Sequence, residues 1–274
     1  MQRIQCKIAP SLGGGFEGNP NDVWGTVDYT NDNEPCIFFG MYGLPDFYSL
    51  WKHKGKKYIL WAGSDIRHLA NGYWLEDGGD IRIESFGVSK WINRYCESFV
   101  ENEVEQKMLK DIGIESKIVP SFLGDINKFD ISFIKTDPVK LYTSVSGDDF
   151  DLYGWYDIQE IAEKNPDVEF HLYGNKRDFN ISANNVFVHG RVSKEQMNEE
   201  TKLMTGALRL TEFDGFSEIL CKSILWGQYP VSRIKYPFMF GVDDIPKLKE
   251  LSNPNIDGRE YFKSIINKYP WKYE

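Results

Sequence analysis

The sequence has few cysteines and no long apolar run. Only four of its 274 residues are cysteine, and no two of them form a Cys-x-x-Cys pair: Cys6, Cys36, Cys96 and Cys221. This scatter indicates neither a zinc site nor a disulfide framework. Nowhere do about 18 apolar residues run together without a charge or a helix breaker, and the start has no apolar core of a secretory signal. We therefore expect a cytoplasmic protein with no stable membrane insertion.

Basic residues are also fewer than acidic residues. Lys and Arg number 32 against 41 Asp and Glu, which gives a net charge of −9. An acidic chain is not drawn indiscriminately to polyanions, so contact with nucleic acid would need a local basic patch such as the lysines of residues 52–57. Hydrophobic residues make up 41% and aromatic residues 15%, which predicts a folded globular protein. A length of 274 residues suggests about two modest domains or one large one.

Short β-rich apolar runs alternate with amphipathic stretches along the whole chain. This alternation predicts an α/β fold in which helices cover parallel sheets. The predicted strands are 3–9, 36–39, 57–62, 98–100 and 117–120 in the first half, and 139–145, 168–173, 186–189, 207–211 and 229–232 in the second. The polar segment 132–140 is the predicted linker, which divides the chain into domains 1–137 and 138–274. The last helix, about 256–270, could pack on either domain.

Ligands of doubly wound sheets bind beyond the carboxyl ends of the strands, so the candidate residues are sought just after strands. Three glycines follow the first strand, Gly13, Gly14 and Gly15, and would let backbone N–H groups approach a phosphate or sugar. The alternative is a plain flexible turn. After strand 57–62, Asp65 could orient an acceptor hydroxyl or act as a base, Arg67 could hold an anion, and His68 adds an imidazole. The alternative here is a helix cap with a structural interaction between Asp65 and Arg67.

The strongest local pattern follows strand 207–211. A loop formed by Asp214, Gly215, Phe216 and Ser217 precedes an almost wholly apolar helix that ends at Gly227. Free N–H groups of residues 215–218 and the positive end of the helix dipole would suit a diphosphate. Arg209 and Lys222 could add positive charge, although Glu218 stands four residues before Lys222 and would make an ordinary helix-surface pair.

At these residues the chain resembles the GT-B glycosyltransferases, and within them it is most similar to family 4 of the retaining enzymes. That family carries a Glu-Gly-Phe-Gly loop, a second Glu eight positions later, and then Gly-x-Pro-Val. The loop 214–217 stands for the first element and residues 227–231 for the last, while Arg209, Thr211 and Asp214 match a variant Arg-x-Thr-x-x-Asp-Gly. Looser matches at 63–65, 98–114, 117–129, 165–174 and 185–192 extend the resemblance over nearly the whole chain.

The resemblance implies two Rossmann-like domains that face each other across a cleft, with a sugar transferred from a nucleotide-diphosphate sugar to an acceptor there. It implies retention of configuration and no metal, so the acidic residues 148–151 are interpreted as a solvated loop. The donor would lie against the second domain and the acceptor mostly against the first. The expected donor-binding residues are Gly13, Gly14, Gly15, Gly147, Lys176, Arg177, Arg191, Val192, Asp214, Gly215, Phe216, Ser217, Glu218 and Lys222. The expected catalytic residues are Asp65, Arg67, His68 and Arg209.

Three positions depart from the family pattern. Lys222 replaces the second Glu, Ala62 replaces a His, and residues 147–154 lack the usual Arg and Lys, whose role could pass to Lys176, Arg177 or Arg209. These departures keep two alternatives open, a non-catalytic nucleotide-sugar binding protein and a GT-B sugar-nucleotide epimerase. The acceptor also stays open between a carbohydrate, a lipid-linked group facing the aromatic stretch 38–51, and a modified base of viral DNA.

Overall fold

The computed structural model describes residues 4–12, 18–71 and 85–272. Their contacts divide the chain into two compact units. Unit 1 comprises the described residues up to Asp125, the short segment Phe213–Phe216 and the chain from Ile265 onward; unit 2 comprises Ile126–Glu212 and Ser217–Ser264. We predicted a boundary near residue 137, and the contacts divide the chain after Asp125. The segment before the first strand of unit 2 packs within that unit, where Phe133 contacts the ring of Tyr229.

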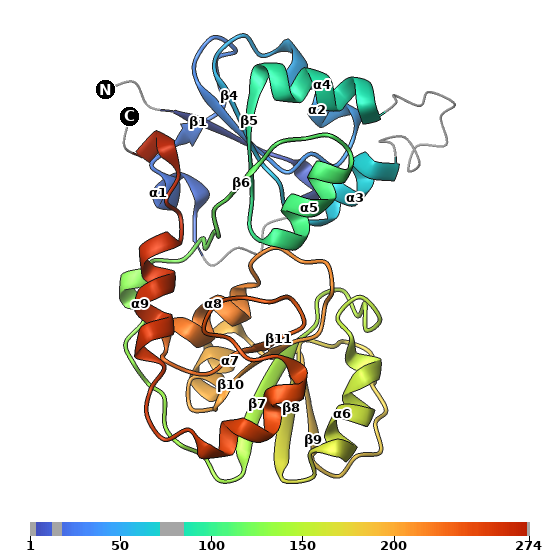
Figure 1. Ribbon diagram of the computed structural model, residues 1–274, viewed down its shortest axis with the longest axis vertical. Coiled ribbons are helices and arrows are strands. Elements are labelled where there is room, and N and C mark those ends of the chain that lie inside the picture. Colours follow the sequence, from blue (N-terminus) through green and yellow to red (C-terminus); the bar gives the residue numbers. More distant parts are fainter. Residues whose placement is uncertain (1–3, 13–17, 72–84, 273–274) are drawn as a thin grey trace. The chain divides into compact units, whose positions relative to one another are not determined.

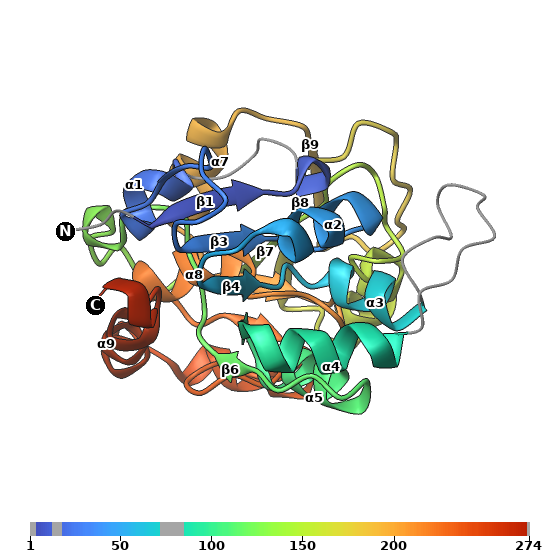
Figure 2. The same ribbon diagram turned by 90° about the horizontal axis from the view of Figure 1, so that it is seen from above.

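Unit 1 is built on a six-stranded sheet with the strand order β2-β1-β3-β4-β5-β6. All of its strand pairs are parallel, and Figure 2 shows β1, β3 and β4 side by side. The strands are β1 (Gln5–Ile8), β2 (Val27–Asp28), β3 (Cys36–Phe39), β4 (Lys57–Leu60), β5 (Cys96–Val100) and β6 (Lys117–Ile118). The helices are α1 (Pro20–Trp24), α2 (Leu44–Lys52), α3 (Ser64–Asn71), α4 (Ser85–Tyr95) and α5 (Glu103–Asp111), with a 3₁₀ turn at Pro10–Leu12. All five strands predicted in this half are confirmed.

The core of unit 1 lies on both faces of its sheet, because parallel strands are covered by helices on each side. Alternate residues of β3 enter different clusters: Cys36 and Phe38 pack on one face, and Ile37 and Phe39 on the other. The C-terminal stretch contributes the 3₁₀ turn Pro270–Lys272 and adds the rings of Tyr269 and Trp271 to the second cluster. Distant parts of the sequence therefore share one core.

Unit 2 contains a five-stranded parallel sheet with the strand order β11-β10-β7-β8-β9. Its strands are β7 (Val139–Ser144), β8 (Val168–Tyr173), β9 (Val186–Gly190), β10 (Gly206–Arg209) and β11 (Val231–Ser232). Its helices are α6 (Ile158–Lys164), α7 (Lys194–Thr201), α8 (Glu218–Leu225) and α9 (Ile256–Ile265), with 3₁₀ segments at Ile126–Lys128, Trp155–Asp157 and Val242–Glu250. Figure 1 shows α6 beside β8 and β9. The α/β fold class is confirmed in both units.

Helix α8 is the most buried helix of unit 2. Every residue from Ile219 to Leu225 is buried, which is why its sequence lacks the polar face of an ordinary surface helix. The chain turns away at Gly227, whose φ of +75° lies in the left-handed region that favours glycine. Among the described residues, no helix combines the length and the apolar character that a membrane span requires.

Candidate functional site

The predicted donor-binding residues of unit 2 lie along one edge of its sheet. Gly147 follows β7, Lys176 and Arg177 follow β8, and Arg191 and Val192 follow β9 directly. Since the strands are parallel, all of these loops emerge at the same edge, together with the end of β10. The topology therefore brings together residues that the sequence spreads over more than sixty positions, from Gly147 to Arg209.

Arg209 ends β10 at this edge and is 9% exposed. Its guanidinium lies over the ring of Tyr153, 4.4 Å from the ring centroid, in the loop that follows β7. Tyr153 was not among the predicted residues, and only the pairing of β7 with β10 brings it to Arg209. Two residues beyond Arg209, the buried hydroxyl of Thr211 has no hydrogen-bond partner among the described residues. An aromatic ring thus packs against a buried cation at the end of β10, and a buried hydroxyl without a partner follows two residues later in the described chain.

Lys222 lies in the buried face of α8, and its side chain is only 7% exposed. Its ammonium group donates to Asn198 Oδ1 at 3.0 Å and lies 2.9 Å from Glu218 Oε1. The ion pair with Glu218, which was the alternative interpretation, is therefore present. The pair and the hydrogen bond to Asn198 give the buried ammonium group the partners that offset its loss of hydration.

The loops after β7 and β8 are tied together by Asp148. Its carboxylate accepts hydrogen bonds from the backbone N–H of Lys176 at 2.6 Å and of Arg177 at 3.3 Å. The Arg177 guanidinium donates to the Asp148 carbonyl oxygen at 2.9 Å and lies over the ring of Phe150. Asp148 therefore has a structural role in joining the two loops. Within the described parts of the chain, no group of three or more His, Cys, Asp or Glu side chains is placed to hold a metal ion.

In unit 1, Asp65 is completely buried in the first turn of α3. Its two carboxylate oxygens accept hydrogen bonds from the N–H groups of Met41 at 2.8 Å and Ala62 at 3.0 Å. Burial raises the pKa of Asp65 to about 7, although these N–H groups oppose the shift. The geometry favours a structural role, in which Asp65 holds the ends of β3 and β4 together, over direct contact with an acceptor.

The other two predicted residues of α3 are more accessible. Arg67 and His68 are both half-buried. The His68 ring packs edge-on against Tyr42, with 5.7 Å between the ring centroids, and the Tyr42 hydroxyl accepts a hydrogen bond from Ser64. Desolvation raises the pKa of Tyr42 to about 12, so the phenol stays protonated near neutral pH. Gly13, Gly14 and Gly15 lie outside the described residues.

The segment Phe213–Phe216 packs against the carboxyl end of β5 in unit 1. Phe216 N–H donates to Glu101 Oε2 at 2.5 Å, and Asn102 Nδ2 donates to the Asp214 carbonyl at 2.7 Å. The expectation that the N–H groups of residues 215–218 are free is thus wrong for Phe216. The other oxygen of Glu101 accepts from the N–H and hydroxyl of Ser121. Glu101 therefore fixes the position of this segment.

A second carboxyl group, that of Glu105, lies beside Glu101. Glu105 Oε2 accepts from the Glu101 N–H at 2.8 Å, whereas its buried Oε1 has no hydrogen-bond partner among the described residues. Desolvation raises the pKa of both side chains, and the charge of Glu101 raises that of Glu105 further. Glu101 accepts hydrogen bonds from Ser121 and Phe216, which favour its charged form. We therefore assign to Glu105 the proton that this pair of carboxyl groups shares.

Glycine is required where the segment meets this pair. A Cβ at Gly215 would lie 1.9 Å from Glu101 Oε2, and a Cβ at Gly63 would lie 3.1 Å from Glu105 Oε1 and 3.3 Å from the Gly215 nitrogen. Sequence reasoning missed both glutamates, because Asn102 caps α5 and Glu105 stands three residues later, which is the spacing of an ordinary helix start. The two glycines were the available signal.

No protein-family model matches the chain, and no curated protein matches it. Solved structures match its fold. The chain is 16% identical to TarM over 89% of its own length and 54% of TarM, with a TM-score of 0.52. It is 11% identical to the sucrose-phosphate synthase from Thermosynechococcus elongatus, over 87% of this chain and 70% of that one, with a TM-score of 0.58. It is 10% identical to Anabaena HepE in complex with UDP and glucose, over 97% and 95%, with a TM-score of 0.50.

These similarities concern the fold. The chain spans about half the length of TarM, the first of these structures. Identities of 10% to 16% carry no residue roles from one protein to another. The expected resemblance is confirmed at this level: the two parallel α/β sheets of this chain have the GT-B fold of the glycosyltransferases that it matches.

Proposed function

We propose that the chain is a glycosyltransferase that moves a sugar from a nucleoside-diphosphate sugar to an acceptor. The observation that carries the proposal is the edge of unit 2, where the loops after β7, β8 and β9 converge with buried Arg209. Ligands of doubly wound sheets bind at such an edge. Two structures of similar fold support a nucleotide-sugar donor: HepE was solved with UDP and glucose, and the pneumococcal O-GlcNAc transferase GtfA with UDP and GlcNAc.

In the proposed reaction, the bond between the sugar C1 and the diphosphate oxygen breaks, and its electron pair leaves with the diphosphate. The acceptor hydroxyl oxygen bonds to C1 and loses its proton. Arg209 and the amide groups at the start of α8 would stabilise the departing negative charge without a metal ion. Retention of configuration belongs to the proposal through the family resemblance alone.

The acceptor is proposed to contact unit 1 near α3. Arg67 and His68 are the candidates there, because their side chains are partly accessible whereas Asp65 is enclosed by backbone donors. Asp65 then positions α3 without touching the reacting atoms. His68 would accept or relay the acceptor proton through a ring nitrogen of its imidazole.

Binding of the donor is tested by calorimetry with UDP, GDP, ADP, dTDP and their sugars. We expect one nucleotide to bind, and Arg209→Met to weaken it at least about tenfold through loss of a charge-assisted contact. Lys164→Met is the matched control, because it removes an exposed positive charge of α6 that pairs only locally with Glu160. Equal affinity in wild type and Arg209→Met would contradict the proposed donor position.

Turnover separates the enzyme from its alternatives. Release of nucleoside diphosphate that depends on an added acceptor supports glycosyl transfer. Conversion of the donor sugar without any acceptor would instead identify an epimerase, and binding without turnover across an acceptor panel would identify a non-catalytic binding protein. Unchanged transfer in excess EDTA is expected, and loss that is restored by a divalent ion would refute the metal-independent mechanism.

A further inference from the structure

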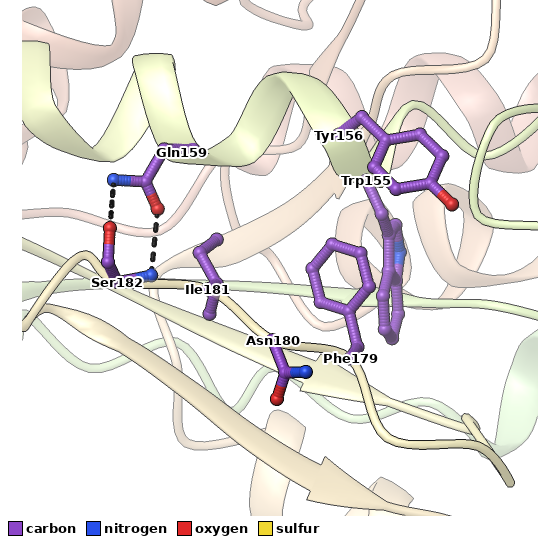
Figure 3. Close-up of a pocket in the computed structure, with 7 residues that line it drawn as sticks. All are labelled: Trp155, Tyr156, Gln159, Phe179, Asn180, Ile181 and Ser182. Carbon is purple, nitrogen blue, oxygen red and sulfur yellow. Dashed lines mark hydrogen bonds between the residues drawn. The ribbon is translucent and has the colours of Figure 1, made fainter.

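Unit 2 contains a pocket that the proposed function does not use. The pocket has a volume of about 490 Å³ and lies between the start of α6 and the connection from β8 to β9. Its seven lining residues are drawn in Figure 3: Trp155, Tyr156, Gln159, Phe179, Asn180, Ile181 and Ser182. This volume lies within the range of small-molecule sites, roughly 300 to 1,000 Å³.

The connection between β8 and β9 explains why a pocket forms here. The crossovers from β7, β9 and β10 each carry a helix, whereas residues 174–185, all of them described, contain none. An irregular segment therefore stands where a crossover helix usually packs beside α6. Loops that follow the carboxyl ends of strands in an α/β sheet commonly carry binding residues.

One side of the pocket is aromatic. Tyr156 is 63% exposed, and its ring lies 5.9 Å from that of Phe179, measured between centroids. Phe179 packs in turn against Trp155 at 5.1 Å and Phe150 at 4.8 Å, so buried rings support the accessible ones. A rigid aromatic surface of this kind suits the C–H face of a pyranose ring.

The other side of the pocket is polar and uncharged. Gln159 Oε1 accepts from the N–H of Ser182 at 3.0 Å and its Nε2 donates to the Ser182 hydroxyl at 2.9 Å, which fixes both residues (Figure 3). The exposed side chain of Asn180 lies near Phe179, with Ile181 between it and Ser182 (Figure 3). Gln159 also accepts from the Ala183 N–H and donates to Glu163, so its amide is fully used within the protein. The Asn180 amide and the Ser182 hydroxyl can donate and accept hydrogen bonds, as the hydroxyls of a sugar do.

Charge distinguishes this pocket from a phosphate site. None of the seven lining residues carries a positive charge at neutral pH. A smaller pocket of about 260 Å³ adjoins it through Tyr156, Phe179 and Asn180, and adds one Arg and one Asp, Arg177 and Asp178. The Arg177 guanidinium is already held by the Asp148 carbonyl and carboxylate. The pocket thus lacks the cationic groups that bind an anionic ligand.

We propose that this pocket binds an uncharged pyranose unit of a glycan, at a site separate from the proposed donor site. The inference goes beyond the proposed function, because glycan binding here requires neither a nucleotide nor turnover. A glycosyltransferase with such a site would hold a carbohydrate acceptor or product at a second point along its chain. Among the acceptors left open by the sequence, the site favours a carbohydrate.

The test is saturation-transfer NMR on the full chain with uncharged hexasaccharides of glucose, mannose, galactose and N-acetylglucosamine, each at about 10 mM. We expect at least one to bind, and Tyr156→Ala and Asn180→Ala each to weaken it at least about tenfold. Tyr48→Ala is the control, because it removes a tyrosine of α2 that is 49% exposed in unit 1. Circular dichroism checks that each variant is folded.

Three results would overturn the proposal. They are absence of binding by all four hexasaccharides, equal binding by wild type and both pocket variants, and complete displacement of the glycan by UDP. The last would place the sugar in the donor site. Because glycan binding is measured before any UDP is added, failure of the glycan proposal leaves the calorimetric test of the proposed function unaffected, and the reverse also holds.

Discussion

Substitution of Gly215 by alanine tests the contact between the segment 213–216 and the carboxyl pair. The new methyl group would lie 1.9 Å from Glu101 Oε2, against an ordinary contact of about 3.5 Å. Glu101 cannot turn aside easily, because its other oxygen is held by Ser121. The segment must therefore move by roughly 1.5 Å, which breaks the hydrogen bond from Phe216 to Glu101.

The cost follows from the bonds that are lost. A hydrogen bond to a charged group is worth about 1.5 to 3 kcal/mol, and the bond from Asn102 to the Asp214 carbonyl about 1 kcal/mol. We expect the free energy of local opening to fall by about 3 kcal/mol, which raises the exchange rate of protected amides about a hundredfold.

Hydrogen exchange followed by mass spectrometry measures this on the peptide that covers residues 213–217. Gly87→Ala is the matched control, since a Cβ there meets nothing within 4 Å and the residue is exposed in α4. We expect the control to exchange like wild type and to gain slightly in stability through helix propensity. Exchange within about threefold of wild type in Gly215→Ala would refute the reasoning.

Three further predictions concern ionisation and packing. The pKa of Asp65 is raised from 3.8 to about 7, so ionisation of this carboxyl group opposes folding. The free energy of unfolding should therefore fall as the pH rises between these values, by about 4 kcal/mol for this group. Asp65→Asn should reduce the difference in melting temperature between pH 5 and pH 8, and an unchanged difference would contradict the assignment. Lys222→Met should cost about 1 to 2 kcal/mol by thermal unfolding, because it removes both the hydrogen bond to Asn198 and the ion pair with Glu218, whereas the exposed Lys164→Met should cost almost nothing. Trp271→Ala should lower the free energy of unfolding by about 3 to 5 kcal/mol, since Trp271 is 9% exposed and its ring packs against those of Tyr58 and Tyr269. A decrease below about 1 kcal/mol in urea unfolding would show that the C-terminal turn adds little to stability.

Most strands could be predicted because their signal is local. A parallel strand covered on both faces is a largely apolar run, and β3 is wholly apolar. Strands β4 and β8 are also rich in apolar and aromatic residues, although β4 begins with Lys57 and β8 contains Glu169 and His171. The short strand β2 (Val27–Asp28) was missed, since two residues carry no periodicity. The pair between Lys222 and Glu218 could also be foreseen as an alternative, because a helix fixes the distance between residues four positions apart.

Contacts between distant residues were decided by the tertiary structure alone. Glu101 and Phe216 are 115 positions apart, and no spacing rule relates them. The aromatic pocket likewise joins two segments, one from the start of α6 and one from the connection to β9. The sequence by itself determined which segments are buried strands, since burial leaves an apolar pattern in each. Which polar groups then meet depends on how the strands are ordered in the sheet, and that order results from packing energies summed over the whole chain.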